Sequence, residues 1–240
     1  MSGVKVYVDF ASREQEYLFD AGQTYARNLF ANGLLTDRSL CSGLGTCGQC
    51  KIRFTFNPPE PEVKDLHVFS HQELAQGYRL ACIHFPEPGQ KIEIPPAKNS
   101  FSFSKKSQSP PNYLAIDIGT TSIKWAVIHA DKQTSNGQCL NPQMGSGAEV
   151  VSRLAFALES ESNHDLLKSL IRETIKQIAR EAGFWGSRFD AQGSTINSYL
   201  CVAGNPAMIY LLLGLDVQEI SFAPFKISYW GGCVESLDKE

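Results

Sequence analysis

The chain has 240 residues, of which 42% are hydrophobic and 20% are charged, and its 22 Lys and Arg residues against 25 Asp and Glu give a net charge of −3. This is the composition of a folded protein, the length fits two domains, and the faintly acidic balance argues against a nucleic-acid binder. No apolar run is long enough to span a bilayer, and the N-terminus lacks the pattern of a signal peptide. The sequence therefore predicts a cytoplasmic protein that binds neither membrane nor nucleic acid.

Residues 4–96 are predicted to form one compact unit, because apolar periodicity and turn residues alternate along them in short segments. Asp20, Gly22 and Thr24 provide turn and N-cap chemistry before the first helix. The expected elements are strands at Val4–Phe10 and Tyr17–Phe19 joined by a turn at 11–15, a helix that contains Leu29 and Phe30 and ends at Asn32-Gly33, a strand at Lys51–Phe56, a short helix at His71–Gln76, and strands at Leu80–Ile83 and Lys91–Ile94.

The composition then changes, and a second unit is expected after the change. Residues 95–112 are polar and bounded by proline pairs, which is typical of a linker. The second unit is predicted to begin at Tyr113. Its expected elements are strands at Tyr113–Ile118, Ser122–His129 and Ile196–Ala203, a long amphipathic helix at Asp165–Glu181, and an apolar helix at Ala207–Leu213 that ends at Gly214.

Cysteine is the most informative residue type in this chain. The seven cysteines are an odd number, and three of them crowd into one short loop, which argues against a disulfide framework. A local cluster of thiols in a reducing compartment indicates metal or redox chemistry. Cys139, Cys201 and Cys233 lie outside the cluster and are interpreted as spare thiols, with Cys201 expected to be buried in its strand.

The spacing Cys41-x5-Cys47-x2-Cys50, followed by Cys82 much later, offers four thiolates to zinc or to an iron–sulfur cluster. Zinc sites usually use two short knuckles, whereas here one loop supplies three ligands. A loop of this kind can wrap a 2Fe–2S cluster with its backbone N–H groups directed at the sulfides. Such a loop needs residues that tolerate positive φ and close approach, and its glycines supply them: Gly43, Gly45 and Gly48.

A second motif lies at the start of the second unit. Asp117, Gly119, Thr120 and Thr121 form a tight turn between two apolar strands. The backbone N–H groups and hydroxyls of such a turn can bind a phosphate, and Asp117 can hold Mg²⁺ through water. A β-hairpin with a capped turn and no ligand is the alternative interpretation of the same residues.

The cysteine loop, with Tyr78-Arg79-Leu80-Ala81-Cys82 downstream, resembles the plant- and vertebrate-type 2Fe–2S ferredoxins of β-grasp fold, and its first gap is like the vertebrate-type spacing. The resemblance implies that Cys41, Cys47, Cys50 and Cys82 hold the cluster. An all-cysteinyl cluster has a reduction potential of about −400 mV and passes one electron at a time, which predicts an electron carrier. His84 is interpreted as a structural residue, because four cysteines already complete the ligand set.

The Asp117 turn is similar to the first phosphate motif of the superfamily of actin, heat-shock and sugar-kinase ATPases. Placed after a ferredoxin-type domain, it resembles the ATP-dependent reductive activators of corrinoid proteins. The resemblance implies a β-grasp 2Fe–2S domain at 1–96, a linker at 97–112, and at 113–240 the first lobe of a ribonuclease-H-like ATPase domain, an α+β unit followed by an α/β unit. Further matches are Asn141-Pro142-Gln143, residues 147–153, Ala203-Gly204-Asn205, Met208, residues 211–214 and Pro224-Phe225.

This family implies a function: one electron passes through the cluster to a corrinoid protein and returns its cobalt from Co(II) to Co(I), with an upstream electron donor and with ATP and Mg²⁺ as further ligands. Members of the family have two lobes, and residues 113–240 correspond to roughly the first, which leaves open a truncated member, one half of a split protein or a degenerate form that keeps only the electron-transfer domain. Glu149 and Pro206 stand where the family usually has Asp and Thr, so ATP hydrolysis by this chain alone stays open. The alternatives are an activator whose nucleotide site is completed by another chain, and a general ferredoxin for another oxidoreductase.

Overall fold

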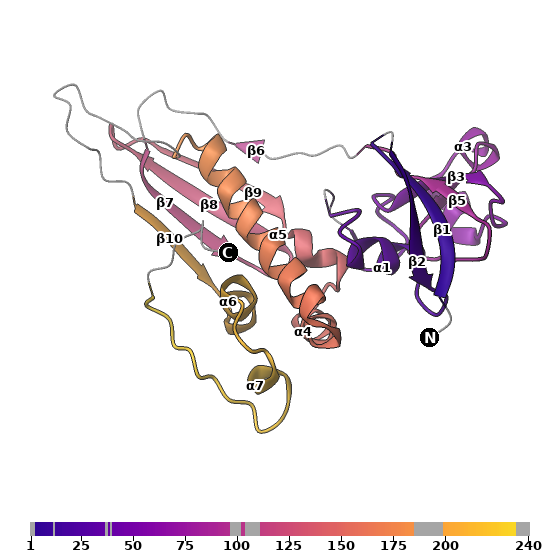
Figure 1. Ribbon diagram of the computed structural model, residues 1–240. Coiled ribbons are helices and arrows are strands. Elements are labelled where there is room, and N and C mark those ends of the chain that lie inside the picture. The colour runs from indigo at the N-terminus through magenta and orange to yellow at the C-terminus, as the bar shows by residue number, and fades with distance from the viewer. Residues whose placement is uncertain are drawn as a thin grey trace. The chain divides into compact units, whose positions relative to one another are not determined.

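The computed structural model (Figure 1) has a mixed α/β fold. Two compact units follow from the contacts within the chain, residues 1–99 with 144–148 and residues 100–143 with 149–240. Within the described residues each unit contains one five-stranded sheet. The residues described are 3–11, 13–36, 38, 40–96, 111–184 and 199–233, together with the backbone of 102–103.

The first unit is built on a sheet with the strand order β2-β1-β5-β3-β4. Its central strands β1 and β5 are parallel, and the other neighbouring pairs are antiparallel. The strands are β1 (Gly3–Phe10), β2 (Arg13–Asp20), β3 (Lys51–Phe56), β4 (Tyr78–Leu80) and β5 (Lys91–Glu93), and the helices are α1 (Tyr25–Ala31), α2 (Val63–Val68) and α3 (His71–Ala75).

Helix α1 supplies much of the core of the first unit. Its Leu29 and Phe30 are fully buried, as are Val6 and Ile92 of the two parallel strands. The helix begins after Thr24, whose hydroxyl accepts a hydrogen bond from the N–H of Arg27 at 3.4 Å. Burial of these side chains stabilises the unit by about 1.5–3 kcal/mol for each large apolar residue.

The sequence predicts the elements of this unit well at β1, α1, β3 and α3. The predicted turn at 11–15 is wrong, because Phe10 pairs directly with Arg13 and the second strand already begins there. The short connection is possible because Ala11 takes a positive φ of 53°. Helix α2 was not predicted: its Val63 and Leu66 are exposed, so the segment carries no amphipathic signal.

The second unit has the strand order β10-β7-β8-β9-β6, with β7 and β10 parallel and the other pairs antiparallel. The strands are β6 (Ser102–Phe103), β7 (Pro111–Ile118), β8 (Ser122–His129), β9 (Thr134–Leu140) and β10 (Tyr199–Gly204). The helices are α4 (Val150–Glu159), α5 (Glu161–Glu181), α6 (Pro206–Leu213) and α7 (Gln218–Ser221), and the 3-10 turn η1 (Pro142–Gly145) begins in this unit and ends in the segment 144–148 that belongs to the first unit.

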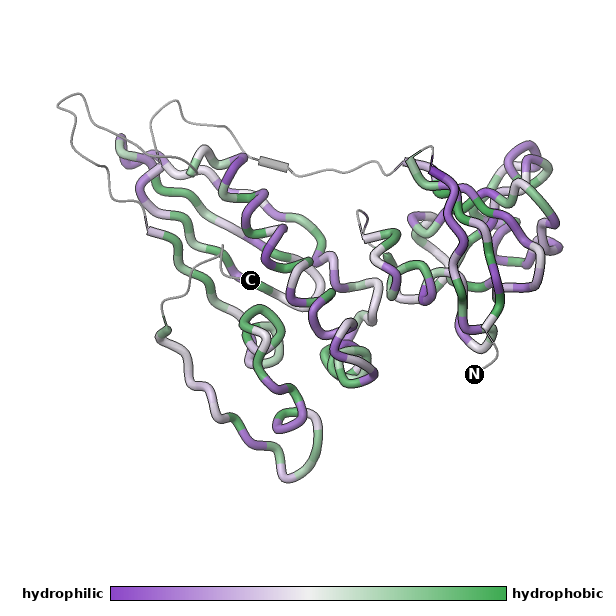
Figure 2. Tube along the Cα trace, in the orientation of Figure 1, coloured by the Kyte–Doolittle hydropathy of each residue, from purple (hydrophilic) through white to green (hydrophobic). Residues whose placement is uncertain are grey.

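The two faces of this sheet differ in burial. Ile116 and Trp125 lie on a buried face, over which the long helix α5 runs in Figure 1. Figure 2 shows apolar and polar residues alternating along β7, β8 and α5. On the opposite face Tyr113 and Tyr199 are exposed and stack with their ring centroids 5.7 Å apart. Cys201 shares this open face and is exposed, so its predicted burial was wrong.

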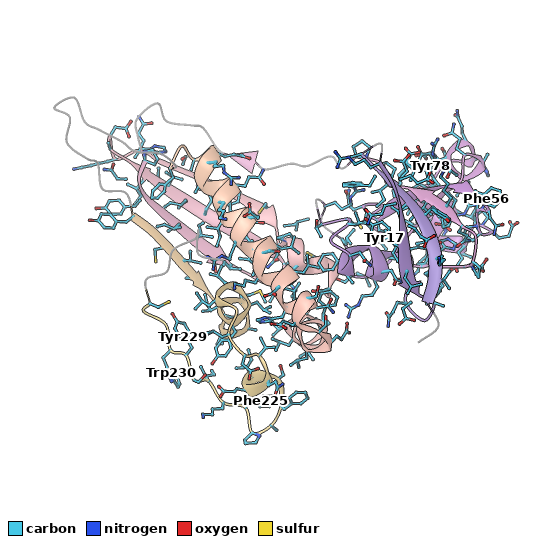
Figure 3. All side chains as sticks on the ribbon, in the orientation of Figure 1. Tyr17, Phe56, Tyr78, Phe225, Tyr229 and Trp230 are labelled. Carbon is cyan, nitrogen blue, oxygen red and sulfur yellow. The ribbon has the colours of Figure 1, made fainter. Side chains whose placement is uncertain are left out.

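The segment after α7 is tied back to α6 through one hydroxyl group. Tyr210 accepts hydrogen bonds from the N–H groups of Ser228 at 2.8 Å and Tyr229 at 3.1 Å. Phe225 and Trp230 of this segment are 73% and 85% exposed, and Figure 3 shows them along the extended chain. The tie to Tyr210 therefore orders a segment whose large side chains contribute little to the core.

Strands β7 and β8 and helices α5 and α6 confirm the predictions for the second unit. Strand β9 and helix α4 were not predicted; β9 contains few apolar residues and so produces a weak period-two signal. Most of the predicted linker at 97–112 lies outside the described residues. Of the remainder, Ser102–Phe103 form β6 and Pro111 opens β7, two residues before the predicted start.

Candidate metal centre

The four clustered cysteines come from two parts of the first unit. Cys41 and Cys47 lie in the loop between α1 and β3, Cys50 directly precedes β3, and Cys82 follows β4. The thiols of Cys41 and Cys47 interact with each other, and so do those of Cys50 and Cys82. The fold therefore places the four predicted ligands as two close pairs, one within the loop and one between the residue before β3 and the segment after β4.

The pair Cys50–Cys82 is held by regular backbone pairing. The carbonyl oxygen of Cys50 accepts the N–H of Ala81 at 3.0 Å, next to the antiparallel pair Lys51–Leu80. The hydrogen bond to Cys82 and burial both raise the pKa of Cys50, whereas the same bond lowers the pKa of Cys82. A metal bound here would replace this shared proton, since thiolates are the ligand form.

The pair Cys41–Cys47 is carried by the loop, and backbone N–H groups surround its first sulfur. Burial raises the pKa of the Cys41 thiol, but hydrogen bonds from the N–H groups of Thr46, Cys47 and Gly45 lower it to about 7 overall. The N–H of Gly45 is also directed at the sulfur of Cys82. These N–H groups stabilise negative charge on sulfur, which is the environment that an anionic metal–thiolate centre requires.

The backbone of the loop explains its glycines. Positive φ values occur at Ser42, Gly43, Gly45 and Gly48, at 52°, 90°, 72° and 67°. These conformations are strained for residues with a Cβ atom, and a chain that adopts them in succession directs its N–H groups inward. The three glycines predicted as cluster-loop support therefore occupy the positions where the loop turns.

The arrangement differs from that of a site for one ion. Within the described residues, no group of three or more His, Cys, Asp or Glu side chains is placed to hold a metal ion. Charge interactions also link the two pairs, between Cys41 and Cys82 and between Cys47 and Cys50. Four thiolates are a donor set that suits zinc or an iron–sulfur cluster.

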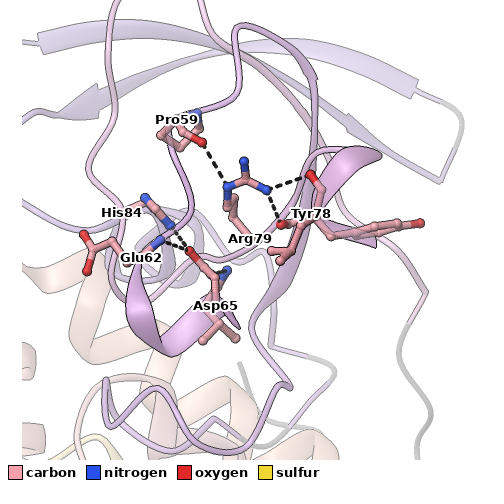
Figure 4. A network of polar contacts seen from close by, with 8 residues as sticks. Pro59, Glu62, Asp65, Tyr78, Arg79 and His84 are labelled. Carbon is pink, nitrogen blue, oxygen red and sulfur yellow. Dashed lines mark hydrogen bonds and ion pairs between the residues drawn. The ribbon is translucent and has the colours of Figure 1, made fainter. Parts of the chain in front are cut away.

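A buried polar network lies beside the Cys82 segment (Figure 4). The carboxylate of Asp65 is fully buried and accepts the N–H of Glu62 at 2.9 Å and of Leu80 at 2.8 Å, and Nε2 of His84 lies 2.6 Å from it. Arg79 donates to three backbone carbonyls in the same region. His84 therefore has a structural partner, as expected, whereas no sequence signal indicates the role of Asp65.

Acid should weaken the first unit through Asp65. Burial raises the pKa of Asp65, but the hydrogen bonds from His84, Leu80 and Glu62 outweigh it and lower the pKa below its ordinary 3.8. A carboxyl with a lowered folded pKa contributes stability above the unfolded value and loses it as the pH falls through the folded value. Urea unfolding between pH 7 and pH 3 should show a steeper loss below about pH 4 in wild type than in Asp65→Asn; equal slopes would contradict this.

The predicted turn in the second unit lies at the carboxyl end of β7. Gly119 donates its N–H to the carbonyl of Ser122 at 3.0 Å, and a Cβ atom at Gly119 would lie 2.6 Å from that oxygen. Asp117 and Thr121 are exposed, and Thr120 is half-buried. Asn141 and Arg153, which belong to the further family matches, both hydrogen-bond to this turn. The structure thus places the four residues predicted to bind a nucleotide on one accessible hairpin end.

The departure at Glu149 has a local structural consequence. Glu149 is the N-cap residue of α4, and its side chain makes no capping hydrogen bond. Aspartate is among the best N-cap residues because its shorter carboxylate reaches the N–H groups of the first turn. The substitution Glu149→Asp is expected to stabilise the protein by about 0.5–1 kcal/mol, measured as a higher thermal midpoint; an unchanged midpoint would contradict this.

Comparison with known proteins gives a family match for the second unit. Residues 113–231 match the family model described as the RACo middle region. The chain is 28% identical to the corrinoid activation enzyme RamQ of Eubacterium limosum over 172 residues, which cover 69% of this chain and 26% of RamQ. The resemblance to reductive activators of corrinoid proteins is thereby confirmed. In the described residues, no helix combines the length and the apolar character needed to cross a membrane.

Two further similarities concern a redox enzyme and a solved structure. The chain is 44% identical over 75 residues to one component of the Na⁺-translocating NADH-quinone reductase of Chlamydia muridarum, covering 31% of this chain and 17% of that component. A solved reductive activator for a corrinoid iron–sulfur protein matches 94% of this chain and 51% of its own length, with 20% identity and a TM-score of 0.40. The chain thus spans about a quarter of RamQ and about half of the solved activator.

Proposed function

We propose that the chain is an iron–sulfur electron carrier that serves the reductive activation of a corrinoid protein. The observation that carries this proposal is the arrangement of Cys41, Cys47, Cys50 and Cys82 as two adjacent thiol pairs under a loop of inward N–H groups. The similarity to RamQ and to the RACo middle region supports a corrinoid protein as the acceptor. The acceptor's cobalt would be returned from Co(II) to Co(I) with one electron from an upstream donor.

A 2Fe–2S cluster held by the four thiolates would supply one-electron chemistry at a potential of about −400 mV. The chain's own residues would bind the cluster and tune its reduction potential. The four thiolates would hold the irons, and the N–H groups of Gly45, Thr46 and Cys47, which hydrogen-bond to Cys41, would stabilise the added negative charge of a reduced cluster. The low exposure of Cys50 limits solvent access on the side of β3, while the loop pair lies nearer the surface.

We further propose the domain assignment implied by the resemblance: a β-grasp ferredoxin domain at 1–96, a linker at 97–112 and a ribonuclease-H-like lobe at 113–240. The parallel pair β1–β5 beside α1 supports the first assignment. The parallel pair β7–β10, connected through α4 and α5, supports the second. ATP and Mg²⁺ are proposed ligands of the turn at Asp117, Gly119, Thr120 and Thr121, and the cytoplasm is the proposed compartment.

The test is a reduction assay under anaerobic conditions. The protein, loaded with iron and sulfide, is added in catalytic amount to an excess of a low-potential reductant and a corrinoid protein poised as Co(II), and the Co(I) absorption band is followed. We expect the chain to accelerate the appearance of Co(I), with Cys82→Ser inactive and Cys201→Ser fully active as the matched control. Mg-ATP is added in parallel reactions to reveal a nucleotide requirement.

The acceptor class is tested by comparison with an unrelated acceptor. A chain that reduces cytochrome c through its cluster but leaves Co(II) unchanged, with and without Mg-ATP, would favour the general ferredoxin over the corrinoid activator. A chain that binds zinc and no cluster after anaerobic reconstitution would overturn the electron-transfer function itself.

A further inference from the structure

The carbonyl oxygens of the turn at Gly119, Thr120 and Thr121 all accept hydrogen bonds from residues of the same unit. Nδ2 of Asn141 donates to the carbonyl of Gly119 at 2.8 Å, and the N–H of Asn141 donates to the carbonyl of Thr121 at 2.8 Å. Nη2 of Arg153 donates to the carbonyl of Thr120. Asn141 and Arg153 thus donate hydrogen bonds to three consecutive carbonyl groups, and these bonds fix the orientation of the turn's peptide groups.

Both donors are fully buried. Asn141 and Arg153 have no exposed surface, and the sulfur of Met208 lies 3.7 Å from Nδ2 of Asn141 and 3.5 Å from Nη1 of Arg153. The side-chain oxygen of Asn141 accepts the N–H of Gln143 at 2.9 Å. Burial lowers the pKa of Arg153 to about 10, which still leaves the guanidinium charged at neutral pH. A buried positive charge therefore lies directly behind the turn.

The backbone N–H groups of the turn, unlike its carbonyl oxygens, are available to a ligand. Among the described residues, the N–H groups of Thr120 and Thr121 make no hydrogen bond. The N-terminus of α6 lies at the same edge of the sheet, since Gly204 of β10 pairs with Ile118 and Asn205 caps the helix. Turn N–H groups, a helix N-terminus and a buried guanidinium all favour negative charge at one place.

We infer that Arg153 and Asn141 are positioning residues that hold this turn with its N–H groups outward, so that it binds the phosphate groups of an anionic ligand. Asp117 is exposed on the same hairpin and is placed to hold the divalent cation that accompanies such a ligand. The inference rests on the nucleotide part of the proposed function and adds to it two residues that do not touch the ligand. A buried arginine does more here than stabilise the fold, because its hydrogen bond and its charge both act on the turn.

The experiment compares ligands that differ in phosphate. Binding of Mg-ATP and of adenosine to the full, cluster-loaded chain is measured by calorimetry or equilibrium dialysis. The variants are Arg153→Met, which removes the charge and the donor, Arg153→Lys, which keeps the charge, and Arg180→Met as a control on an exposed arginine. Far-UV circular dichroism and the thermal midpoint establish that each variant is folded.

Wild type should bind Mg-ATP more tightly than adenosine. Arg153→Met should reduce the Mg-ATP affinity by about tenfold or more and leave the adenosine affinity unchanged, Arg153→Lys should retain part of the preference, and Arg180→Met should behave as wild type. A structural role would weaken both ligands together or neither, so a folded Arg153→Met with an unchanged ratio overturns the inference. If Arg153→Met does not fold, an unchanged ratio in Arg153→Lys overturns it instead.

Failure of this inference and failure of the proposed electron transfer have different signatures. A wild-type chain that shows no preference for Mg-ATP over adenosine overturns the role of the turn, whatever the cluster does. Reduction of Co(II) by the same sample without nucleotide reports on the electron carrier alone. The two readouts therefore separate the second unit's anion site from the first unit's metal centre.

Discussion

Replacing Cys50 by serine is expected to leave the protein without a reducible cluster. Cys50 is 2% exposed, forms a pair with Cys82 and directly precedes β3, so its sulfur has a fixed position that a serine hydroxyl cannot fill as a ligand. Iron and acid-labile sulfide should fall from about two each per chain to near zero, and the visible absorption that bleaches on reduction should disappear.

The matched controls are the cysteines outside the cluster. Cys201 and Cys233 are exposed, and Cys139 lies in β9 of the other unit, so serine at any of these positions should leave iron, sulfide and spectrum unchanged. Normal cluster content in Cys50→Ser, or an equal loss in Cys201→Ser, would show that the ligand set is assigned wrongly. Far-UV circular dichroism of the Cys50→Ser protein distinguishes loss of the cluster from loss of the fold.

Removal of the Asp65 carboxylate is expected to be the most damaging change outside the cysteines. The group is fully buried and accepts hydrogen bonds from Glu62, Leu80 and His84, so Asp65→Ala leaves three polar groups, two of them buried, without their acceptor. Breaking one side of a buried pair of this kind destabilises by about 3–5 kcal/mol. The free energy of unfolding, from urea titration followed by circular dichroism, should fall by that amount.

The control for Asp65 is an acidic residue of the same unit that lies on the surface. Glu16 pairs with Lys5 at 3.0 Å in an exposed ion pair, and such pairs contribute little to stability. Glu16→Ala should therefore unfold as wild type does. Asp65→Asn, which keeps one acceptor oxygen, should have a free energy of unfolding between those of wild type and Asp65→Ala. An Asp65→Ala protein as stable as wild type would contradict this prediction, because it would mean that water satisfies the former donors of Asp65 at no cost in stability.

Much of the fold could be predicted from periodicity and turn chemistry. Strands such as β3 and β8 alternate strictly, and α1 and α6 end at Asn32 and Gly214, residues that favour helix termination. What escaped prediction lacks a local signal. Helix α2 exposes Val63 and Leu66 and buries the polar Asp65, so its sequence carries no amphipathic pattern.

In the candidate site, too, some features could be predicted from the sequence and others could not. Spacing and chemistry are enough to predict the cysteines as ligands and the loop glycines as their support, because the ligand types are rare and positive φ favours residues without a Cβ atom. Spacing does not reveal which thiols form pairs, since that depends on the β3–β4 register. The contacts of Asn141 and Arg153 with the turn near Gly119 are equally invisible in sequence, because each joins segments far apart along the chain.

The loop pair also determines how the protein must be handled before iron is present. Cys41 carries a thiol whose pKa is about 7, and it shares a hydrogen bond with Cys47. At neutral pH a large share of this thiol is the nucleophilic thiolate, with a second thiol already in contact. Air oxidation of a metal-free preparation should therefore close a disulfide at this pair first, so the yield of reconstituted protein depends on keeping a reductant present from lysis onward.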